Sequence, residues 1–454
     1  MKYIAAALTS SLLLLSACSG ANAPGGSGSS DSLKLHYLTS VKSVADPAIN
    51  PKFKNIEGEK DLVYVLGKKK LGLQADDVVN IFDFEKKRIF KIDPKAKTYE
   101  EHSLYLNPGI KHADAARRAQ IAKIVKDSGA NVGNTYDPFN SGCELGMIVP
   151  GDEENPGITV SEKEGKVEYS YKGKVVASAV LGDAVPEAFL PMMEKFYVYN
   201  CNIHPFIRKD LLSRKRIPKE LNVEINVKGL TNTIKMALKS NDGPAFSLDL
   251  ASDYKIAYPK GQPLSNLQEL IFVKKEIPVL PKRENAFAEA KTLVAKKELV
   301  DALLTMIEYS LCTGDQPVSE SEVIMNDTKK DITVKKLQAN MMPKTPQAAL
   351  ASYKVLNTID STKFKKGYII EVLKANVEAQ AGGNPSPRFL YALSKNPGVV
   401  YAYKNLGTYY FSRYDAQNAW DSFDLGRKIK PDHVLFQDIN KLEQGLEESH
   451  PEYF

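Results

Sequence analysis

The stretch NIFDFEKKRIFKIDPKAKTY, residues 80–99, alternates short apolar runs with polar turn segments. In its central run, Phe90 and Ile92 flank Lys91, and the segments EKK and DPK stand on either side. Alternating runs bounded by turn residues are typical of neighbouring antiparallel strands. This stretch therefore predicts a β-meander, which extends over residues 78–105.

The same period of two dominates from Leu33 to about Glu276. Two helical patterns, at His112–Asp127 and Pro186–Tyr197, interrupt it. We therefore assign residues 33–280 to a β-rich domain. Its further expected strands are Leu33–Tyr37, Leu62–Leu66, Lys166–Tyr171, Lys174–Val180, Asn222–Lys228, Asn232–Lys239 and Ala245–Leu250.

Residues 80–99 resemble the strand pairs of exported proteins with a lipoprotein-carrier-like half-barrel. In that family a curved antiparallel sheet wraps helices and can hold acyl chains. The resemblance rests on the strand and turn pattern. It implies a half-barrel, and it implies one function for this domain, that of a carrier or sensor of lipid or another hydrophobic ligand.

From Arg283 onward the apolar period changes to 3.6, which predicts helices. Residues 281–340 are expected to form a helical connector, with a loop at Thr328–Val334, and residues 341–454 a helical domain. The fold class is thus α+β, with an antiparallel β-rich domain followed by a helical array. The expected helices of the second domain are Thr345–Leu356, Thr362–Gln380 and Arg388–Ser394, followed by a hairpin at residues 396–431 and a capping helix at His433–Glu448.

The hairpin at residues 396–431 carries apolar and small residues at helical spacing on both sides of a turn at Tyr414-Asp415. It resembles the tetratricopeptide repeat, departing from it at Tyr403, where tryptophan is commonest, and at Gly426, where alanine is usual. Since about three repeats are needed for a stable stack, residues 345–380 would have to act as degenerate repeats. The ordered repeat residues are met by Leu406, Gly407, Tyr410, Ala419, Phe423 and Pro431.

Repeats of this type bind extended segments or other proteins, mainly through the first helix of each pair. The resemblance therefore implies a protein partner. Lys404, Thr408 and Phe411 point away from the seam between the two helices and are the candidate partner-binding residues. In the alternative interpretation, Phe411 packs on a neighbouring helix and the array is purely structural.

The first residues read as an export signal, with Lys2 before an apolar run that is too short to span a bilayer. The run ends in LSAC, residues 15–18, which resembles the lipobox of bacterial lipoproteins. The resemblance implies a signal peptide at 1–17, acylation of Cys18 and a lipidated flexible tether at 18–32. In the alternative, the chain is an ordinary secreted protein and Cys18 lies beside the cut by chance.

Lipidation implies a bacterial envelope protein held by membrane lipid through its acyl chains, such as palmitate. By the same resemblance, Ser19 in place of an aspartate favours the outer membrane, with the protein facing the periplasm. Because the envelope is oxidising, the remaining cysteines can pair. Cys143–Cys201 is the preferred disulfide, since both lie in one predicted domain, and Cys312 is expected to be a buried thiol.

The sequence holds no motif that points to catalysis. Its six histidines have no metal-ligand spacing and are each expected at the surface or in a turn. A net charge of +6 over 454 residues does not favour nucleic acid. We therefore expect a protein that is not an enzyme and that holds no metal or cofactor. A hydrolase is the third hypothesis, after protein binding and ligand carriage, and no sequence motif supports it. The basic residues between Arg208 and Lys219 either touch lipid headgroups or form a solvated face.

Overall fold

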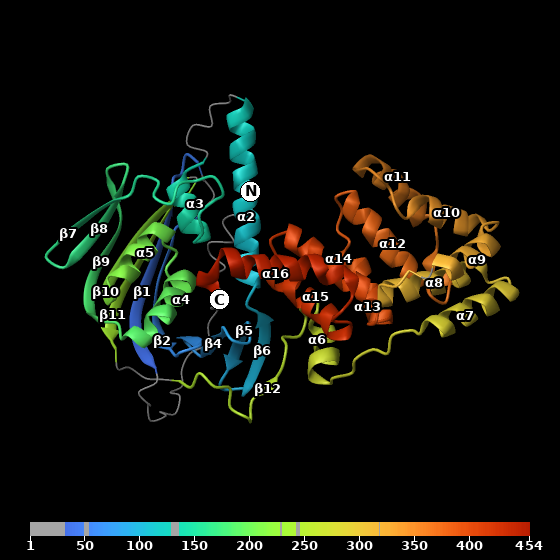
Figure 1. Ribbon diagram of the computed structural model, residues 1–454, viewed down its shortest axis with the longest axis horizontal. Helices are drawn as coiled ribbons and strands as arrows, with labels where there is room; N and C mark the ends of the chain where they lie inside the picture. Colours follow the sequence, from blue (N-terminus) through green and yellow to red (C-terminus); the bar gives the residue numbers. More distant parts are fainter. Residues whose placement is uncertain (1–31, 50–53, 129–135, 228, 242–245, 317) are drawn as a thin grey trace. The chain divides into compact units, whose positions relative to one another are not determined.

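The computed structural model describes residues 32–49, 54–128, 136–227, 229–241, 246–316 and 318–454 (Figure 1). The signal segment, Cys18 and nearly all of the tether lie outside these residues. The chain forms two compact units. The sheet unit runs to Lys255 and also includes Glu443–Phe454, whereas the helical unit is Ile256–Leu442. The last twelve residues, assigned to the helical domain from sequence, thus belong to the sheet unit.

The strands form one 12-stranded sheet in the order β12-β6-β5-β4-β3-β2-β1-β11-β10-β9-β8-β7. Consecutive strands β1 to β6 pair antiparallel, as do β7 to β11, and β1 pairs antiparallel with β11 to join the two sets. With β7 and β12 as edges, the sheet is unclosed. The bounds are β1 Leu33–Ala45, β2 Ile56–Leu66, β3 Lys70–Ala75, β4 Val78–Asp83, β5 Arg88–Asp93, β6 Thr98–Ser103, β7 Thr159–Lys163, β8 Lys166–Tyr171, β9 Lys174–Ala184, β10 Arg216–Val227, β11 Leu230–Ser240 and β12 Lys255–Ile256.

The antiparallel β-rich prediction is confirmed, and residues 80–99 form β4, β5 and the start of β6 as expected. The strand expected at Ala245–Leu250 is wrong, since 246–250 is irregular where it is described. Its apolar residues pack by their side chains instead. Phe246 and Leu250 lie against Val79 and Ile81, on one face of β4.

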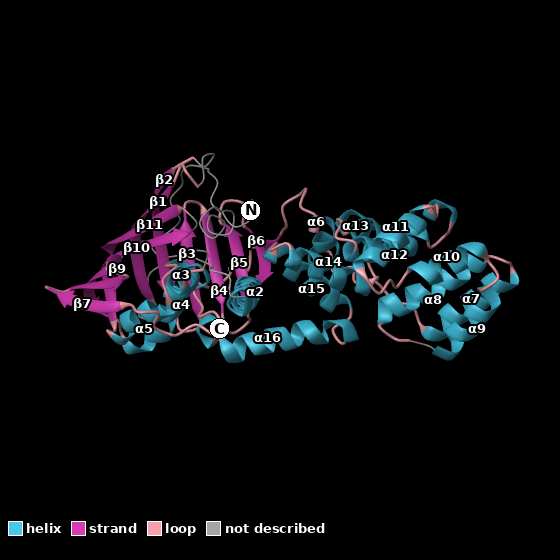
Figure 2. Cartoon of the chain, turned by 90° about the horizontal axis from the view of Figure 1, so that it is seen from above, coloured by secondary structure: helices cyan, strands magenta, loops and turns pink. Residues whose placement is uncertain are grey.

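The other face of the sheet is covered by helices, as Figure 2 shows for α3, α4 and α5. Because strand side chains alternate between faces, Phe82 points to this second face, where its ring lies 4.8 Å from that of Tyr199. Deeper in the core, Phe196 of α4 stacks on Tyr37 at 5.8 Å between ring centroids. The helices are α2 Leu106–Ser128, α3 Pro138–Leu145, α4 Leu190–Asn200, preceded by the 3₁₀ turn η1 Glu187–Phe189, and α5 Pro205–Ser213.

Local sequence explains where α3 and α5 begin, although neither was predicted. Each has proline at its first position, which suits a helix start. The Asp137 side chain accepts a hydrogen bond from the Asn140 amide, and His204 accepts one from the Phe206 amide. These side chains satisfy amides that the first helical turn leaves without a backbone partner.

The helical unit contains α6 to α15 and the start of α16. Its most buried element is α8, which is apolar around most of its circumference and contacts α7, α9, α10, α12 and α14. Residues 281–340, expected as a connector, therefore include the central helix of this unit. The bounds are α6 Ser265–Gln268, η2 Glu269–Val273, α7 Arg283–Ala295, α8 Leu299–Thr313, α9 Val318–Thr328, α10 Ile332–Asn340, α11 Pro346–Asn357, η3 Ser361–Lys363, α12 Gly367–Gln380, α13 Ser386–Lys395, α14 Val400–Ser412, α15 Ala416–Ile429, η4 Val434–Phe436, α16 Gln437–Ser449 and η5 Pro451–Tyr453.

The hairpin expected at residues 396–431 is confirmed as α14 and α15. Gly407 allows their close approach, because a Cβ there would lie 2.4 Å from the Phe423 ring and 2.9 Å from the Ala419 carbonyl oxygen. Tyr403 and Leu406 are fully buried, as the seam interpretation requires.

A second helical hairpin, α12–α13, lies before α14–α15 in the chain, and corresponding residues of the two hairpins are separated by the length of one repeat. Phe389 and Pro397 come roughly 34 residues before Phe423 and Pro431. Both phenylalanines are buried. The helix ends also correspond, since the amides of Asn396 and Lys430 each donate to the carbonyl four residues earlier. Two successive hairpins thus share a register that sequence reasoning found in only one.

Candidate functional site

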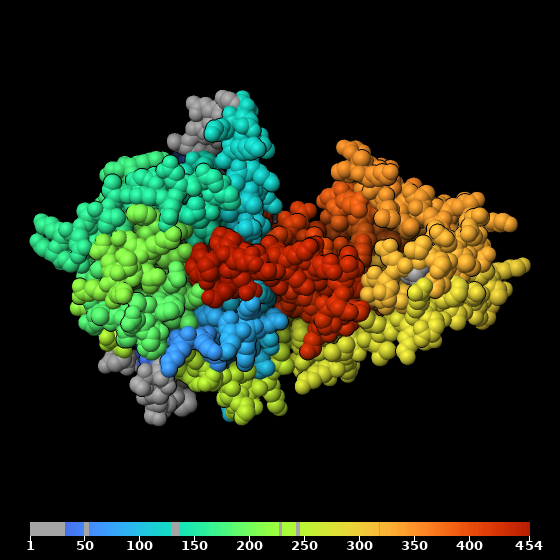
Figure 3. Space-filling view, viewed as in Figure 1, coloured from blue at the N-terminus to red at the C-terminus, as the bar shows by residue number. Residues whose placement is uncertain are grey.

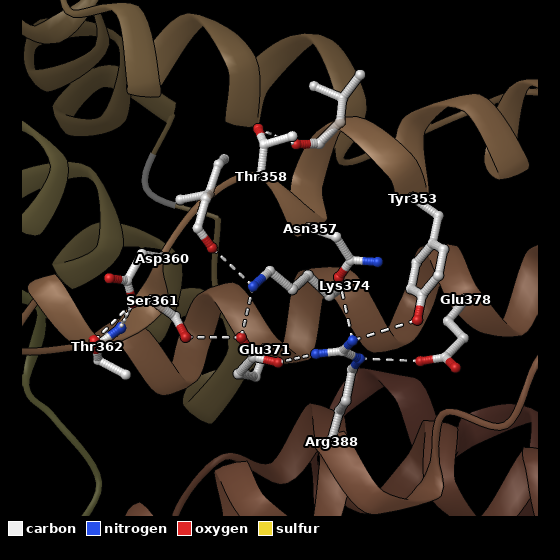
Figure 4. Close-up of polar contacts among 12 residues, drawn as sticks. Tyr353, Asn357, Thr358, Asp360, Ser361, Thr362, Glu371, Lys374, Glu378 and Arg388 are labelled. Carbon is white, nitrogen blue, oxygen red and sulfur yellow. Dashed lines mark hydrogen bonds and ion pairs between the residues drawn. The ribbon is translucent and has the colours of Figure 1, made fainter.

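The helical unit buries a charged cluster on α11, α12 and α13, drawn in Figure 4. At its centre, Glu371 of α12 accepts hydrogen bonds at one carboxylate oxygen from Lys374 Nζ and Ser361 Oγ, both at 2.8 Å. Its other oxygen accepts from Arg388 of α13. Lys374 also donates to the carbonyl oxygen of Ile359 at 2.9 Å. Both carboxylate oxygens therefore accept hydrogen bonds from neighbouring donors.

Arg388 extends this cluster to α11. Its Nε donates to Glu378 Oε2 at 3.0 Å. Its Nη2 lies 3.1 Å from Asn357 Oδ1 and 3.3 Å from the Tyr353 hydroxyl. One guanidinium group thus joins three helices through charge-assisted hydrogen bonds, which are stronger than neutral ones.

The electrostatics of the cluster do not favour proton transfer. Burial raises the pKa of Glu371, but hydrogen bonds from Lys374, Ser361 and Arg388 outweigh it, so the pKa lies below its ordinary value. A general base near neutral pH needs a raised carboxyl pKa and a free oxygen. The cluster instead fixes the order of α11, α12 and α13. The spacing of Glu371, Lys374 and Glu378 at i, i+3 and i+7 in an apolar helix was the sequence signal for it.

The three candidate partner-binding residues lie on α14 with different surroundings. Lys404 forms an ion pair with Asp438 at 2.9 Å, and the Phe411 ring lies edge-on to Trp420 at 5.5 Å. Thr408 is exposed, and its hydroxyl donates to the Lys404 carbonyl. Phe411 therefore packs within the unit, as the structural alternative supposed, and Thr408 presents the most open surface of the three.

The expected disulfide is not formed, because Cys143 and Cys201 are separate, buried free thiols. Cys143 lies in α3, whereas Cys201 directly follows α4, with its sulfur 4.0 Å from that of Met236. Both belong to the main core cluster of the sheet unit, and burial raises the pKa of both thiols. Cys312 is also a buried thiol, as expected.

His102, buried within β6, is neither at the surface nor in a turn as expected. His204 and His433 are buried as well, although each directly precedes a helical segment. Desolvation of His204, aided by the charge of Arg208, lowers its pKa to about 4. Among the described residues, no group of three or more His, Cys, Asp or Glu side chains could hold a metal ion. In the same part of the chain, no helix is both long and apolar enough to cross a membrane.

Several basic side chains between Arg208 and Lys219 form ion pairs with carboxylates of the same unit. Arg214 pairs with Asp210 at 2.8 Å and with Glu162 at 2.7 Å. Lys209 pairs with Glu154. Arg208 is only 3% exposed and points inward. This agrees better with a self-neutralised surface than with a site for lipid headgroups.

Comparisons with known proteins add little to this geometry. No protein-family model matches the chain, and no curated protein matches its sequence significantly. One solved structure, titled "Lipid-protein interactions in lipovitellin", aligns with 10% identity and a TM-score of 0.20. The alignment covers 90% of this chain and 47% of that one. A TM-score this low does not establish a common fold.

Proposed function

We propose that this protein is a non-catalytic lipoprotein of the bacterial cell envelope, anchored through acylated Cys18, whose helical unit binds another protein. The anchor is proposed for the outer membrane, with the folded units facing the periplasm. The observation that carries the binding role is the shared register of α12–α13 and α14–α15. Successive hairpins in repeat register present their first helices side by side, which is how such arrays form a binding surface.

Within that surface, α14 offers the best contact point. Thr408 is exposed, and Lys404 beside it adds a cation, 17% exposed, that already pairs with Asp438. A partner with a carboxylate could compete with Asp438 for this lysine. The buried cluster around Glu371 would hold the neighbouring helices in fixed order beneath such a partner.

A photocrosslinking residue at position 408, introduced in cells, tests the binding role. We expect a specific protein adduct from position 408, and none from a matched crosslinker at the exposed Gln417 of α15. Equal yields at the two positions, or no adduct at either, would contradict a binding surface on α14.

The anchor needs a separate test. Wild-type protein should incorporate labelled palmitate and sediment with membranes, whereas Cys18→Ala should do neither. Cys312→Ala is the matched control and should leave both properties unchanged. A Cys18→Ala protein that stays on the membrane would refute anchoring at this position.

A second candidate function is supported by the sheet unit, namely carriage or sensing of a hydrophobic ligand. The specific observation is an unclosed antiparallel sheet with one apolar face covered by helices, the arrangement that the half-barrel resemblance implies. That face is filled by aromatic side chains, among them Tyr37, Tyr64 and Phe196, so a ligand would require the helices to move. Native mass spectrometry of protein purified from membranes should then detect bound lipid. Lipid-free protein that takes up no fluorescent fatty acid would count against this function.

A further inference from the structure

The end of the chain, Glu447–Phe454, returns to the sheet unit and is called the C-terminal strap here. Figure 3 shows the end of the chain, in deep red, against the green and teal surface of that unit. Glu447 accepts hydrogen bonds from Lys87 Nζ at 2.6 Å and from the Tyr105 hydroxyl. The strap is therefore bonded to the sheet unit from its first residue.

The strap then contacts α4 and α5. Lys195 Nζ of α4 donates to the Pro451 carbonyl at 2.8 Å, and the Tyr199 hydroxyl, also of α4, donates to the Tyr453 carbonyl at 2.9 Å. From α5, Arg208 Nη2 donates to Glu452 Oε1 at 3.1 Å. These donors recognise a main chain and a carboxylate, as a peptide site does.

The strap also contacts α2 and the end of α3. The Tyr453 hydroxyl donates to the Leu145 carbonyl at 3.0 Å. The His450 and His112 rings approach to 3.1 Å between Nε2 and Nδ1. Helices α2, α3, α4 and α5 are thus each in contact with this one segment.

The Tyr453 side chain is fully buried and belongs to the core of the sheet unit. It packs in a small apolar cluster, separate from the main core, with Ala115, Leu145, Met147, Val149 and Val198. Val198 lies on α4, the same helix that carries Phe196 into the aromatic core over the sheet. Removing Tyr453 would therefore loosen the helix that fills the apolar face.

We propose that α2–α5 form a peptide-binding site for residues 447–454 of the same chain, and that its occupancy latches these helices over the sheet. The ligand is a short peptide that forms the end of α16 and the 3₁₀ turn η5, with an acidic residue directly before a tyrosine. The strap continues α16, which begins in the helical unit at Gln437, so one helix links that unit to the latch. This inference goes beyond the proposed function and depends on neither the lipid anchor nor a protein partner.

Hydrogen exchange on the purified full-length protein tests the latch. Tyr453→Ala and Glu452→Gln should each raise exchange in α4 by about ten- to hundredfold, the range expected for losing a charged or buried hydrogen bond. Glu448→Gln, on the exposed side of α16, is the matched control and should change nothing in α4. Exchange in α12–α15 should stay unchanged in all three. Unchanged α4 exchange in a Tyr453→Ala protein whose strap exchanges faster would overturn the proposal.

A peptide experiment tests the site directly. The full-length Tyr453→Ala protein should bind a synthetic peptide of residues 443–454 and regain slow exchange in α4. The same peptide with Glu452→Gln should bind about ten- to hundredfold more weakly, because Arg208 loses its carboxylate. Equal affinity for the two peptides, or slow α4 exchange without peptide, would overturn the proposal. No membrane or partner is present, so this outcome is independent of the proposed function.

Discussion

Each of the two units contains an arginine that donates hydrogen bonds to other side chains or carbonyl groups. The two arginines differ in how far along the chain their bonding partners lie. Arg388 in the helical unit bonds to residues 10 to 35 positions away. Arg208 in the sheet unit bonds to Glu452, 244 positions away. Local contacts cost less loop-closure entropy than distant ones. The helical unit can therefore order its network from neighbouring helices, whereas the sheet unit needs residues 443–454, which lie far along the chain.

The largest expected effect comes from breaking the local network. Lys374→Met leaves Glu371 buried with one cation fewer and should lower the free energy of unfolding of the helical unit by about 3–5 kcal/mol. Lys365→Met removes an exposed pair with Glu298 and should have no measurable effect. Denaturant unfolding followed by hydrogen exchange in each unit measures both. Equal effects of the two substitutions would contradict this prediction, and so would a loss of stability in the sheet unit instead of the helical unit.

A second test concerns the close packing of neighbouring helices. Gly407→Ala places a methyl group against Phe423 and the Ala419 carbonyl and should destabilise the helical unit by about 1–3 kcal/mol. The same substitution at Gly445, where nothing lies within 4 Å of an added Cβ, should be neutral or stabilise α16 by up to about 1 kcal/mol. Thermal unfolding of the two variants checks this. A Gly407→Ala protein as stable as the wild type would show that α14 and α15 do not pack this closely.

Acid should weaken the sheet unit through His204. Burial, aided by Arg208 and opposed by Asp137, lowers the pKa of His204 to about 4 from about 6.5. The neutral ring is favoured in the folded state, so its stability is present above pH 6.5 and lost as pH falls towards 4. Between pH 7 and 5 the loss should be about 2 kcal/mol. His204→Asn keeps an acceptor for the Phe206 amide and should reduce this dependence. An unchanged pH profile in His204→Asn would contradict this role.

The smallest effect compares two thiols. Cys201 directly follows α4 in the sheet unit, and Cys312 lies in the helical unit. Burial raises the pKa of both thiols, so thiol reagents should modify each only slowly in the native protein. Tyr453→Ala should speed modification of Cys201 and leave that of Cys312 unchanged, as read by mass spectrometry. Parallel changes at both thiols would mean that the strap stabilises the whole chain rather than α4.

Elements with a local signal were predicted well. Residues 80–99 form strands because each strand pairs with its sequence neighbour across a short turn. The helix pair at 396–431 followed from small and aromatic residues at helical spacing. Phe246 and Leu250 misled the strand prediction because an apolar alternation also suits an irregular segment packed on a sheet face. Lys404 and Phe411 were predicted to bind a partner from their position on one helix face alone. Their contacts with Asp438 and Trp420 involve other helices, which that pattern does not specify.

By itself, the sequence determined the α+β class, the β-meander and the α14–α15 hairpin, because each depends on residues close together in the chain. Acylation of Cys18 stays a prediction from the lipobox resemblance. Only the tertiary structure decided that α8 lies at the centre of the helical unit, that Cys143 and Cys201 stay apart, and that Glu452 and Tyr453 belong to the sheet unit. Each of these depends on which distant surfaces meet, and a periodic pattern specifies that a face is buried without specifying its partner.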